Sequence, residues 1–331
     1  MAFTTGVATS ITDFFTQLRT FAAANAGFSN DGTTSINGNT VHHLSKGGLF
    51  WNFEETLSAV NGIFTWKYAR MRMTYTKPTV TFNETTPTGQ PRYSCFGFYQ
   101  SEGPYTSHTF FTEGTAIHCL IEVFPNVFNH MSFGSITKFG AWSGGEYITA
   151  GSYQRNSSST NPFVSNSTSF PFADDYGQGH AAGVGAGFTN ACQGFLRYVQ
   201  TGTNNDDFAP MGTVKINNQR CRMSGNFLST QDFSVMNNEL LRSSPNQANL
   251  RAALFPMHVR VRDYTANSPA SRDAYFIGGV IPGVRVCNML ELNPYEIINT
   301  NWQVFPVVQE DGDLTIAPIS LTEAFAYERI A

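Results

Sequence analysis

Near the start of the chain, hydrophobic residues recur every three or four positions, which is the spacing of one face of a helix. The segment SITDFFTQLRTFAAANAG therefore predicts an amphipathic helix within residues 9–27. Its apolar side consists of Phe14, Phe15, Leu18, Phe21 and Ala22. Ser10 and Asp13 resemble a capping box, and Gly27 suits the left-handed residue that ends a helix. A helix this short is unstable alone, so we expect it to dock on this chain or on a neighbour.

Farther along, hydrophobic and polar residues alternate, which predicts β-strands. The segment TVHHLSKGGLFWNFEE indicates two strands joined by a Lys-Gly-Gly turn, and GIFTWKYARMRMTY indicates one long strand. Further strands are predicted at residues 92–99, 116–124, 257–264, 275–288 and 302–308. The predicted fold is mainly β, with a minor α+β character.

The strands are separated by stretches rich in Ser, Asn, Gly and Thr, the longest at residues 155–188 and 201–250. Loops of this length are uncommon in compact domains unless they bind something, so we interpret residues 155–250 as a long loop or arm insertion, with a short helix near 237–254. No linker divides the chain. We therefore predict a single domain over 1–331, with an antiparallel β-sandwich or barrel-like core, the N-terminal helix and long extended loops.

The composition indicates which kinds of molecules the protein contacts. Charged residues make up 13% of the 331 residues, about half the usual ~25%, and there are 29 phenylalanines. A surface so poor in charge suits contact with neighbouring proteins, although a β-rich protein with polar uncharged strands would look the same. The net charge of −4 argues against a general nucleic-acid binder. No apolar run reaches the ~20 residues of a membrane helix, and MAFTTGVATS does not have the pattern of a signal peptide, so we expect a reducing cytoplasm and no membrane.

The cysteines do not indicate a metal site or a disulfide framework. They are odd in number and widely spaced, with no CxxC pair: Cys95, Cys119, Cys192, Cys221 and Cys287. We interpret all five as free thiols, most of them buried.

The strand over 116–124 contains His118 and Glu122, and His130 follows it closely, so we consider a metal site. His118 and Glu122 share one face of that strand but lie two pleats apart, ~13–14 Å, so with His130 they cannot hold one ion. His42 and His43 are adjacent, so a strand points them to opposite faces. We interpret these histidines as solvated or hydrogen-bonded.

Other patterns that suggest chemistry are incomplete. The glycines between Gly179 and Gly187 match neither nucleotide-binding pattern, and Ser143 lacks the flanking glycine of a nucleophile elbow. The remaining acidic groups, Asp174 with Asp175 and Glu310 with Asp311 and Asp313, read as plain acidic turns. We predict no enzyme, and no catalytic, cofactor-binding or metal residues. A glycan-cleaving enzyme using Glu122 or Glu146 is the least favoured hypothesis.

Three arginine pairs have the spacing that places both members on one strand face. They are Arg70 with Arg72, Arg220 with Arg222, and Arg260 with Arg262. They would line a channel for DNA, meet acidic patches on another subunit, or face solvent. Solvent is the favoured interpretation.

Several segments together resemble those of tailed-bacteriophage virion structural proteins. They are TDFFTQLRTFAAANAGFS, HLSKGGLFWNFE, FNHMSFGSITKFGAWSGGEYITAGSY, IPGVRVCNMLELNPYEIINTNWQVFPVV and AYERIA, roughly half of the chain. Residues 155–250 do not contribute. In the third segment, Gly134, Gly140, Gly144 and Gly145 would permit bulges and turns. Phe133, Phe139, Trp142 and Tyr147 would supply contact area, and His130 would bond within that corner.

The resemblance implies a component of the neck, tail or baseplate of a virion, assembled in the bacterial cytoplasm. Its partners would be further copies of the chain and other virion proteins, with a passing contact to phage DNA. The resemblance does not specify which substructure, copy number or symmetry. The alternative is a receptor- or glycan-binding module at the tail tip, with aromatic loops at Tyr99–Tyr105 and Phe163–Tyr176.

Overall fold

The computed structural model describes most of the N-terminal half of the chain and separate strands of the rest. The described residues are 2–60, 64–80, 94–99, 103–141, 144–151, 194–198, 207–211, 222–223, 254–263, 274–288, 292–306 and 323–329. Within them lie one α-helix and three antiparallel sheets, as the prediction of a mainly β fold requires. No helix of this part of the chain is long and apolar enough to cross a membrane.

The helix α1, Ile11–Ala26, confirms the predicted segment and both of its ends. The Asp13 amide donates to Ser10 Oγ at 3.1 Å, and the Thr9 amide donates to Asp13 Oδ2 at 2.8 Å. Gly27 follows in the left-handed conformation with φ 67°. All five residues of the predicted apolar side are buried, so the helix docks on the body of its own chain.

The N-terminal sheet has the order β2-β3-β4-β5-β6. Its strands are β2 Ser29–Ile36, β3 Asn39–Lys46, β4 Leu49–Val60, β5 Phe64–Thr74 and β6 Ser94–Tyr99. Gly47 and Gly48, both with positive φ, make the predicted turn between β3 and β4. Alternation therefore located β3 to β6 correctly, whereas the polar strand β2 was not predicted.

The central sheet has the order β1-β7-β8-β9-β11-β12-β13. Its strands are β1 Ala2–Ala8, β7 Tyr105–Glu113, β8 Ala116–Phe124, β9 Val127–Gly134, β11 Gly144–Gly151, β12 Gly194–Tyr198 and β13 Asp207–Met211. Strands β7, β8 and β9 form a meander, and β1 pairs with β7 at the edge. Two of these strands lie inside the predicted insertion over 155–250, most of which is outside the described residues, as is the helix predicted near 237–254.

The C-terminal sheet has the order β14-β15-β16-β19-β18-β17, and β10 also pairs with β16. Its strands are β10 Thr137–Lys138, β14 Arg222–Met223, β15 Phe255–Asp263, β16 Ala274–Asn288, β17 Ile297–Ile298, β18 Trp302–Pro306 and β19 Glu323–Glu328. Strand β10 follows β9 after two residues, so the chain steps directly from the central sheet to this one.

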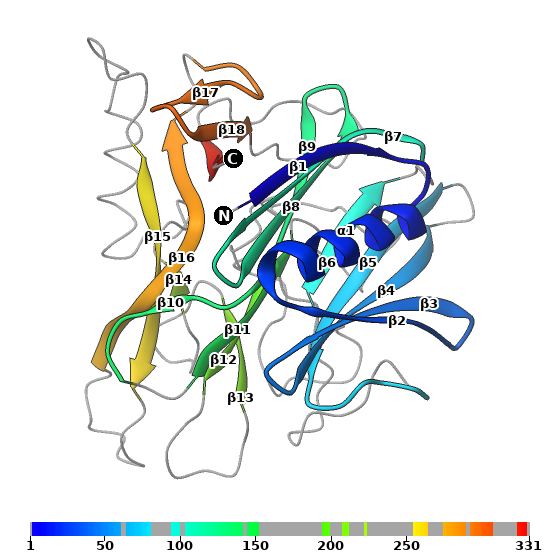
Figure 1. Ribbon diagram of the computed structural model, residues 1–331, viewed down its shortest axis with the longest axis horizontal. Helices are drawn as coiled ribbons and strands as arrows, with labels where there is room; N and C mark the ends of the chain where they lie inside the picture. Colours follow the sequence, from blue (N-terminus) through cyan, green and yellow to red (C-terminus); the bar gives the residue numbers. More distant parts are fainter. Residues whose placement is uncertain are drawn as a thin grey trace.

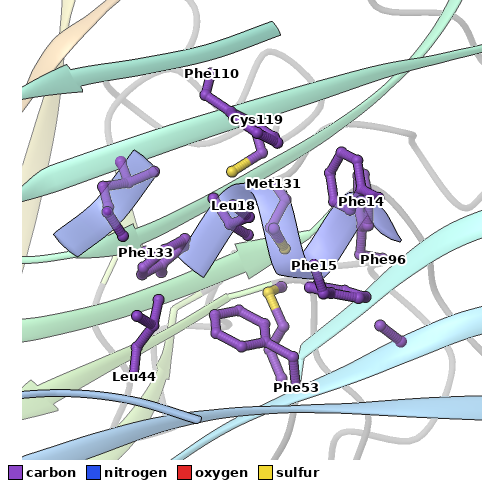
Figure 2. Close-up of a cluster of buried hydrophobic side chains, with 14 of the residues drawn as sticks. Phe14, Phe15, Leu18, Leu44, Phe53, Phe96, Phe110, Cys119, Met131 and Phe133 are labelled. Carbon is purple, nitrogen blue, oxygen red and sulfur yellow. The ribbon is translucent and has the colours of Figure 1, made fainter. Parts of the chain in front are cut away.

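The central sheet is the middle of three layers (Figure 1), and buried side chains lie on both of its faces. On one face, α1 and the N-terminal sheet enclose the main core. Figure 2 shows Phe14 and Phe15 of α1 beside Phe53 and Phe96 of the N-terminal sheet, and Phe110 of the central sheet. On the other face, aromatic side chains of the C-terminal sheet pack against the central one, for example Tyr327 on Phe111 with ring centroids 5.3 Å apart. None of the three sheets closes, so the layered alternative was right and the barrel was wrong.

Candidate functional site

The histidines are the side chains that most invite a functional interpretation. Five of the seven are buried on strands: His42, His43, His108, His118 and His130. His258 is half-buried, and His180 lies outside the described residues. The expectation of solvated or hydrogen-bonded histidines concerned His42, His43, His118 and His130, and its second alternative is the one confirmed. Hydrogen bonds hold all four.

His118 links the central sheet to the C-terminal sheet. Its Nε2 lies 2.7 Å from the carbonyl oxygen of Pro282 on β16, and its Nδ1 lies 2.7 Å from Ser132 Oγ on β9. A carbonyl oxygen can only accept, so Nε2 carries the proton and Nδ1 accepts from the Ser132 hydroxyl. Burial lowers the pKa of His118 to about 4, against the opposing effect of the Pro282 carbonyl. The imidazole is therefore neutral near pH 7.

His130 makes a second link of the same kind. Its Nε2 donates to the Pro306 carbonyl at 3.1 Å, and its Nδ1 accepts from the Tyr327 hydroxyl at 2.9 Å. Burial lowers the pKa of His130 to about 4 and raises that of Tyr327 well above its usual range. The prediction that His130 bonds within the glycine-rich corner was wrong, because its partners come from β18 and β19 of the other sheet.

His42 and His43 point to opposite faces of β3, as predicted. His42 faces the core beside Phe15 and pairs with Glu55, with 2.6 Å between Nε2 and Oε1. His43 lies on the outer face, where Nδ1 is 2.7 Å from Asn52 Oδ1 and Nε2 is 2.7 Å from Thr34 Oγ1. Burial lowers the pKa of both imidazoles. These two side chains therefore fix strand positions and are not assembled around a ligand.

Glu122, the carboxylate named in the least favoured enzyme hypothesis, is also a connector. Its Oε1 accepts from the Asn126 amide at 2.7 Å, and its Oε2 accepts from the Tyr295 hydroxyl at 2.6 Å. The same hydroxyl lies 3.1 Å from Ser107 Oγ. Burial, together with Glu122, raises the pKa of Tyr295 well above its usual range. The carboxylate thus ties the end of β8 to the segment before β17.

Replacing Tyr295 by Phe should lower the free energy of unfolding by about 1–2 kcal/mol, because a hydrogen bond to a carboxylate is lost while the ring stays between Phe128 and Phe305. Denaturant unfolding of the Tyr295→Phe, Glu122→Gln and double variants measures this. We expect the single effects not to add, since both changes remove the same bond. Additive effects would show that the two side chains act independently.

The first arginine pair does not face solvent, so the favoured interpretation was wrong for it. Arg70 forms an ion pair with Glu54, which is 1% exposed, and Asn39 donates to the other oxygen of that carboxylate at 3.0 Å. Arg72 is 3% exposed. Both arginines are thus parts of the outer face of the N-terminal sheet.

One member of the second pair lies opposite one member of the third in the C-terminal sheet. The register of β14 and β15 places Arg222 directly opposite Arg260, and Arg262 follows two residues along β15. Arg220 lies outside the described residues. The register places their backbones only, so a contact of these arginines with DNA, another subunit or solvent stays a prediction.

The remaining candidates are partly described. Cys119 and Cys287 are free and buried, as predicted, and burial raises the pKa of the Cys287 thiol to about 12. Tyr105 is 2% exposed, which removes it from the proposed aromatic binding loop. In the described part of the chain, no three His, Cys, Asp or Glu side chains gather as a metal site would need. The candidates outside the described residues include Trp142, Ser143, Phe163–Tyr176, Gly179–Gly187, Cys192, Cys221 and Glu310–Asp313. Of Glu146, only the backbone is described.

Sequence reasoning did not find the partners that make these groups structural. Tyr327 lies 197 residues from His130, and Tyr295 lies 173 residues from Glu122. The sequence signal for such contacts is weak: polar residues on the second face of an apolar strand, as in β8 and β9, indicate that another layer covers that face.

Comparison with known proteins adds no relative: no protein-family model and no curated protein matches the chain. Its function is therefore inferred from the residues themselves.

Proposed function

We propose that this chain is a non-enzymatic structural component of a tailed-bacteriophage virion, in the neck, tail or baseplate, which assembles as a symmetric homo-oligomer. Its partners are further copies of itself and other virion proteins, and it is assembled in the host bacterial cytoplasm. The proposal starts from the segments that resemble such proteins, and the position of one of these segments in the fold supports it.

The observation that carries the proposal is the role of residues 128–153, the most distinctive of those segments. Strands β9 and β11 of this segment pair in the central sheet, and β10 between them pairs with β16 of the C-terminal sheet. Gly134 has φ 119° and lies against the backbone of Thr115. The distinctive residues therefore shape the junction of two sheets, which is expected of a building block.

Among the described aromatic side chains of the same segment, Phe139 is exposed. Phe139 is 45% exposed, and its amide donates to the Gly278 carbonyl at 2.8 Å, so its backbone is fixed on the C-terminal sheet. Exposing a large apolar side chain to water is unfavourable, and burying it against another copy would remove that cost. We therefore place Phe139 in an interface between copies.

Sedimentation and negative-stain images of the purified protein test the proposal. We expect a mass that is a fixed multiple of 36.5 kDa and images with rotational symmetry. Phe139→Asp should weaken association at least tenfold with an unchanged thermal midpoint, because the side chain is 45% exposed in its own chain. A monomer at every concentration would contradict the proposal, whereas unchanged association of the variant would remove Phe139 from the interface.

A further inference from the structure

The contact between the central and C-terminal sheets contains a small fully buried polar group, which we call the histidine seam. It consists of His118, His130, Ser132 and Tyr327, all 0% exposed, with the carbonyl oxygens of Pro282 and Pro306. The first three side chains belong to β8 and β9, and the remaining groups belong to β16, β18 and β19. In each of the described hydrogen bonds across the seam, one partner is the imidazole of His118 or His130.

The seam fits only neutral imidazoles. Each Nε2–H already donates to a carbonyl, and each Nδ1 accepts from a hydroxyl. A proton added at Nδ1 must find an acceptor, so the Tyr327 hydroxyl would have to turn its own hydrogen toward apolar rings, among them Phe111 and Phe305. Two imidazolium ions would also repel each other in surroundings without water.

Other ionisable groups around the seam are few. Cys119 lies next to His118 and near Tyr327, and burial raises the pKa of its thiol, so it is neutral. On β7, Glu113 approaches Gly283, the residue after Pro282. Glu122 on β8 is bonded to Tyr295, as described above.

One pair of carboxyl groups favours contact between the two sheets at low pH, which is opposite to the effect of the two histidines. Glu328 on β19 bonds to Glu113, and burial and that neighbour raise its pKa, while Arg285 on β16 and the N-terminus lower it. Acid therefore strengthens this contact between the two sheets. Glu328 is only partly buried, so solvent weakens the effect.

The buried histidines on the other side of the central sheet have surroundings that tolerate a proton better. His42 faces the carboxylate of Glu55, which favours its charged form. His43 faces Asn52 Oδ1 and the Thr34 hydroxyl, both of which can accept. Burial lowers the pKa of His108 to about 4 as well, but this is a single ring, and the nearby charge of Asp13 favours its charged form. In the seam, by contrast, the hydrogen bonds described above join each imidazole to one hydroxyl and one carbonyl oxygen.

We propose that the histidine seam is an acid-operated latch: protonation of His118 and His130 releases the C-terminal sheet from the central sheet while α1 and the N-terminal sheet stay packed. The latch does not depend on the proposed function. The released state binds protons that the docked state excludes, so docking is complete above the pKa of a free imidazole, about 6.5. It is lost as the pH falls from there toward about 4, the pKa of both buried rings.

Hydrogen exchange of the full chain, corrected for the intrinsic pH dependence, tests the latch. Between about pH 7 and about 4, we expect amides of β16, β18 and β19 to lose protection together, at least tenfold more than amides of β3, β4 and β5. The His118→Gln/His130→Gln variant keeps donors for the two carbonyls and cannot be protonated, so its C-terminal sheet should stay protected. His258→Gln, on β15 outside the seam, is the matched control and should behave as the natural chain.

A second variant covers the case in which the double variant does not fold. Tyr327→Phe keeps the ring and removes the hydroxyl that favours neutral His130, so release should move to higher pH. Simultaneous loss of protection in all three sheets, a C-terminal sheet that stays protected throughout, or a release pH unchanged by Tyr327→Phe would each overturn the latch.

Discussion

Replacing Phe14 by Ala should lower the free energy of unfolding by about 3–5 kcal/mol, as expected for a fully buried phenylalanine. Its ring is the centre of the main core, with centroids of Phe15, Phe96, Phe98, His108 and Phe110 between 5.3 and 5.8 Å away. Ala is a better helix former than Phe, so the cost arises from the cavity and the lost contacts and not from α1 itself. Denaturant unfolding followed by circular dichroism measures it.

Thr20→Ala is the matched control, because Thr20 lies on the exposed side of the same helix. It should change the stability by no more than about 0.5 kcal/mol. An equally small effect of Phe14→Ala would mean that α1 does not hold the N-terminal and central sheets together, which would contradict the layered core.

Gly134→Ala should cost at least about 3 kcal/mol, because two penalties coincide. With φ 119°, Gly134 has a backbone conformation that residues with a side chain rarely adopt. In addition, a Cβ there would overlap the Thr115 carbonyl oxygen and lie 2.9 Å from its carbonyl carbon. Strand β9 would have to move away from the turn between β7 and β8, which disturbs the middle of the central sheet.

Gly140→Ala separates the two penalties. Gly140 also has positive φ, 76°, but a Cβ there meets nothing within 4 Å. Thermal and denaturant unfolding should show a loss of only about 1 kcal/mol for this variant. Equal losses for the two variants would show that the close approach to Thr115 does not matter, and would weaken the view that this segment forms a sheet junction.

The elements that the sequence predicted are those whose period is visible in a short window. The helix α1 and the pair β3–β4 have clear periods and clear end signals in Ser10, Gly27, Gly47 and Gly48. Strands β1 and β2 were not predicted, because their residues are mainly small or polar and they are edge strands of their sheets. Pairing with a neighbour, and not their own pattern, makes them strands.

The candidate site was predictable only in part, because its meaning depends on which sheet faces which. The sequence places His118 and Glu122 on the polar face of β8, which is correct, and such a face ordinarily reads as solvated. The C-terminal sheet covers that face and supplies Pro282, Tyr295 and Tyr327. Contacts over such sequence distances have no local signature in the sequence. The burial of the polar face of β8 could therefore not be predicted.

We expect the chain to be a virion building block whose ionisable groups join its own layers. An electron cryomicroscopy map of tailed phage particles that carry the chain tests it most directly. The claim predicts several copies related by rotational symmetry around the tail axis, with Phe139 against a neighbouring copy and the histidine seam inside each copy. Purified particles that lack the chain, with the protein present only as a free monomer in the lysate, would contradict it.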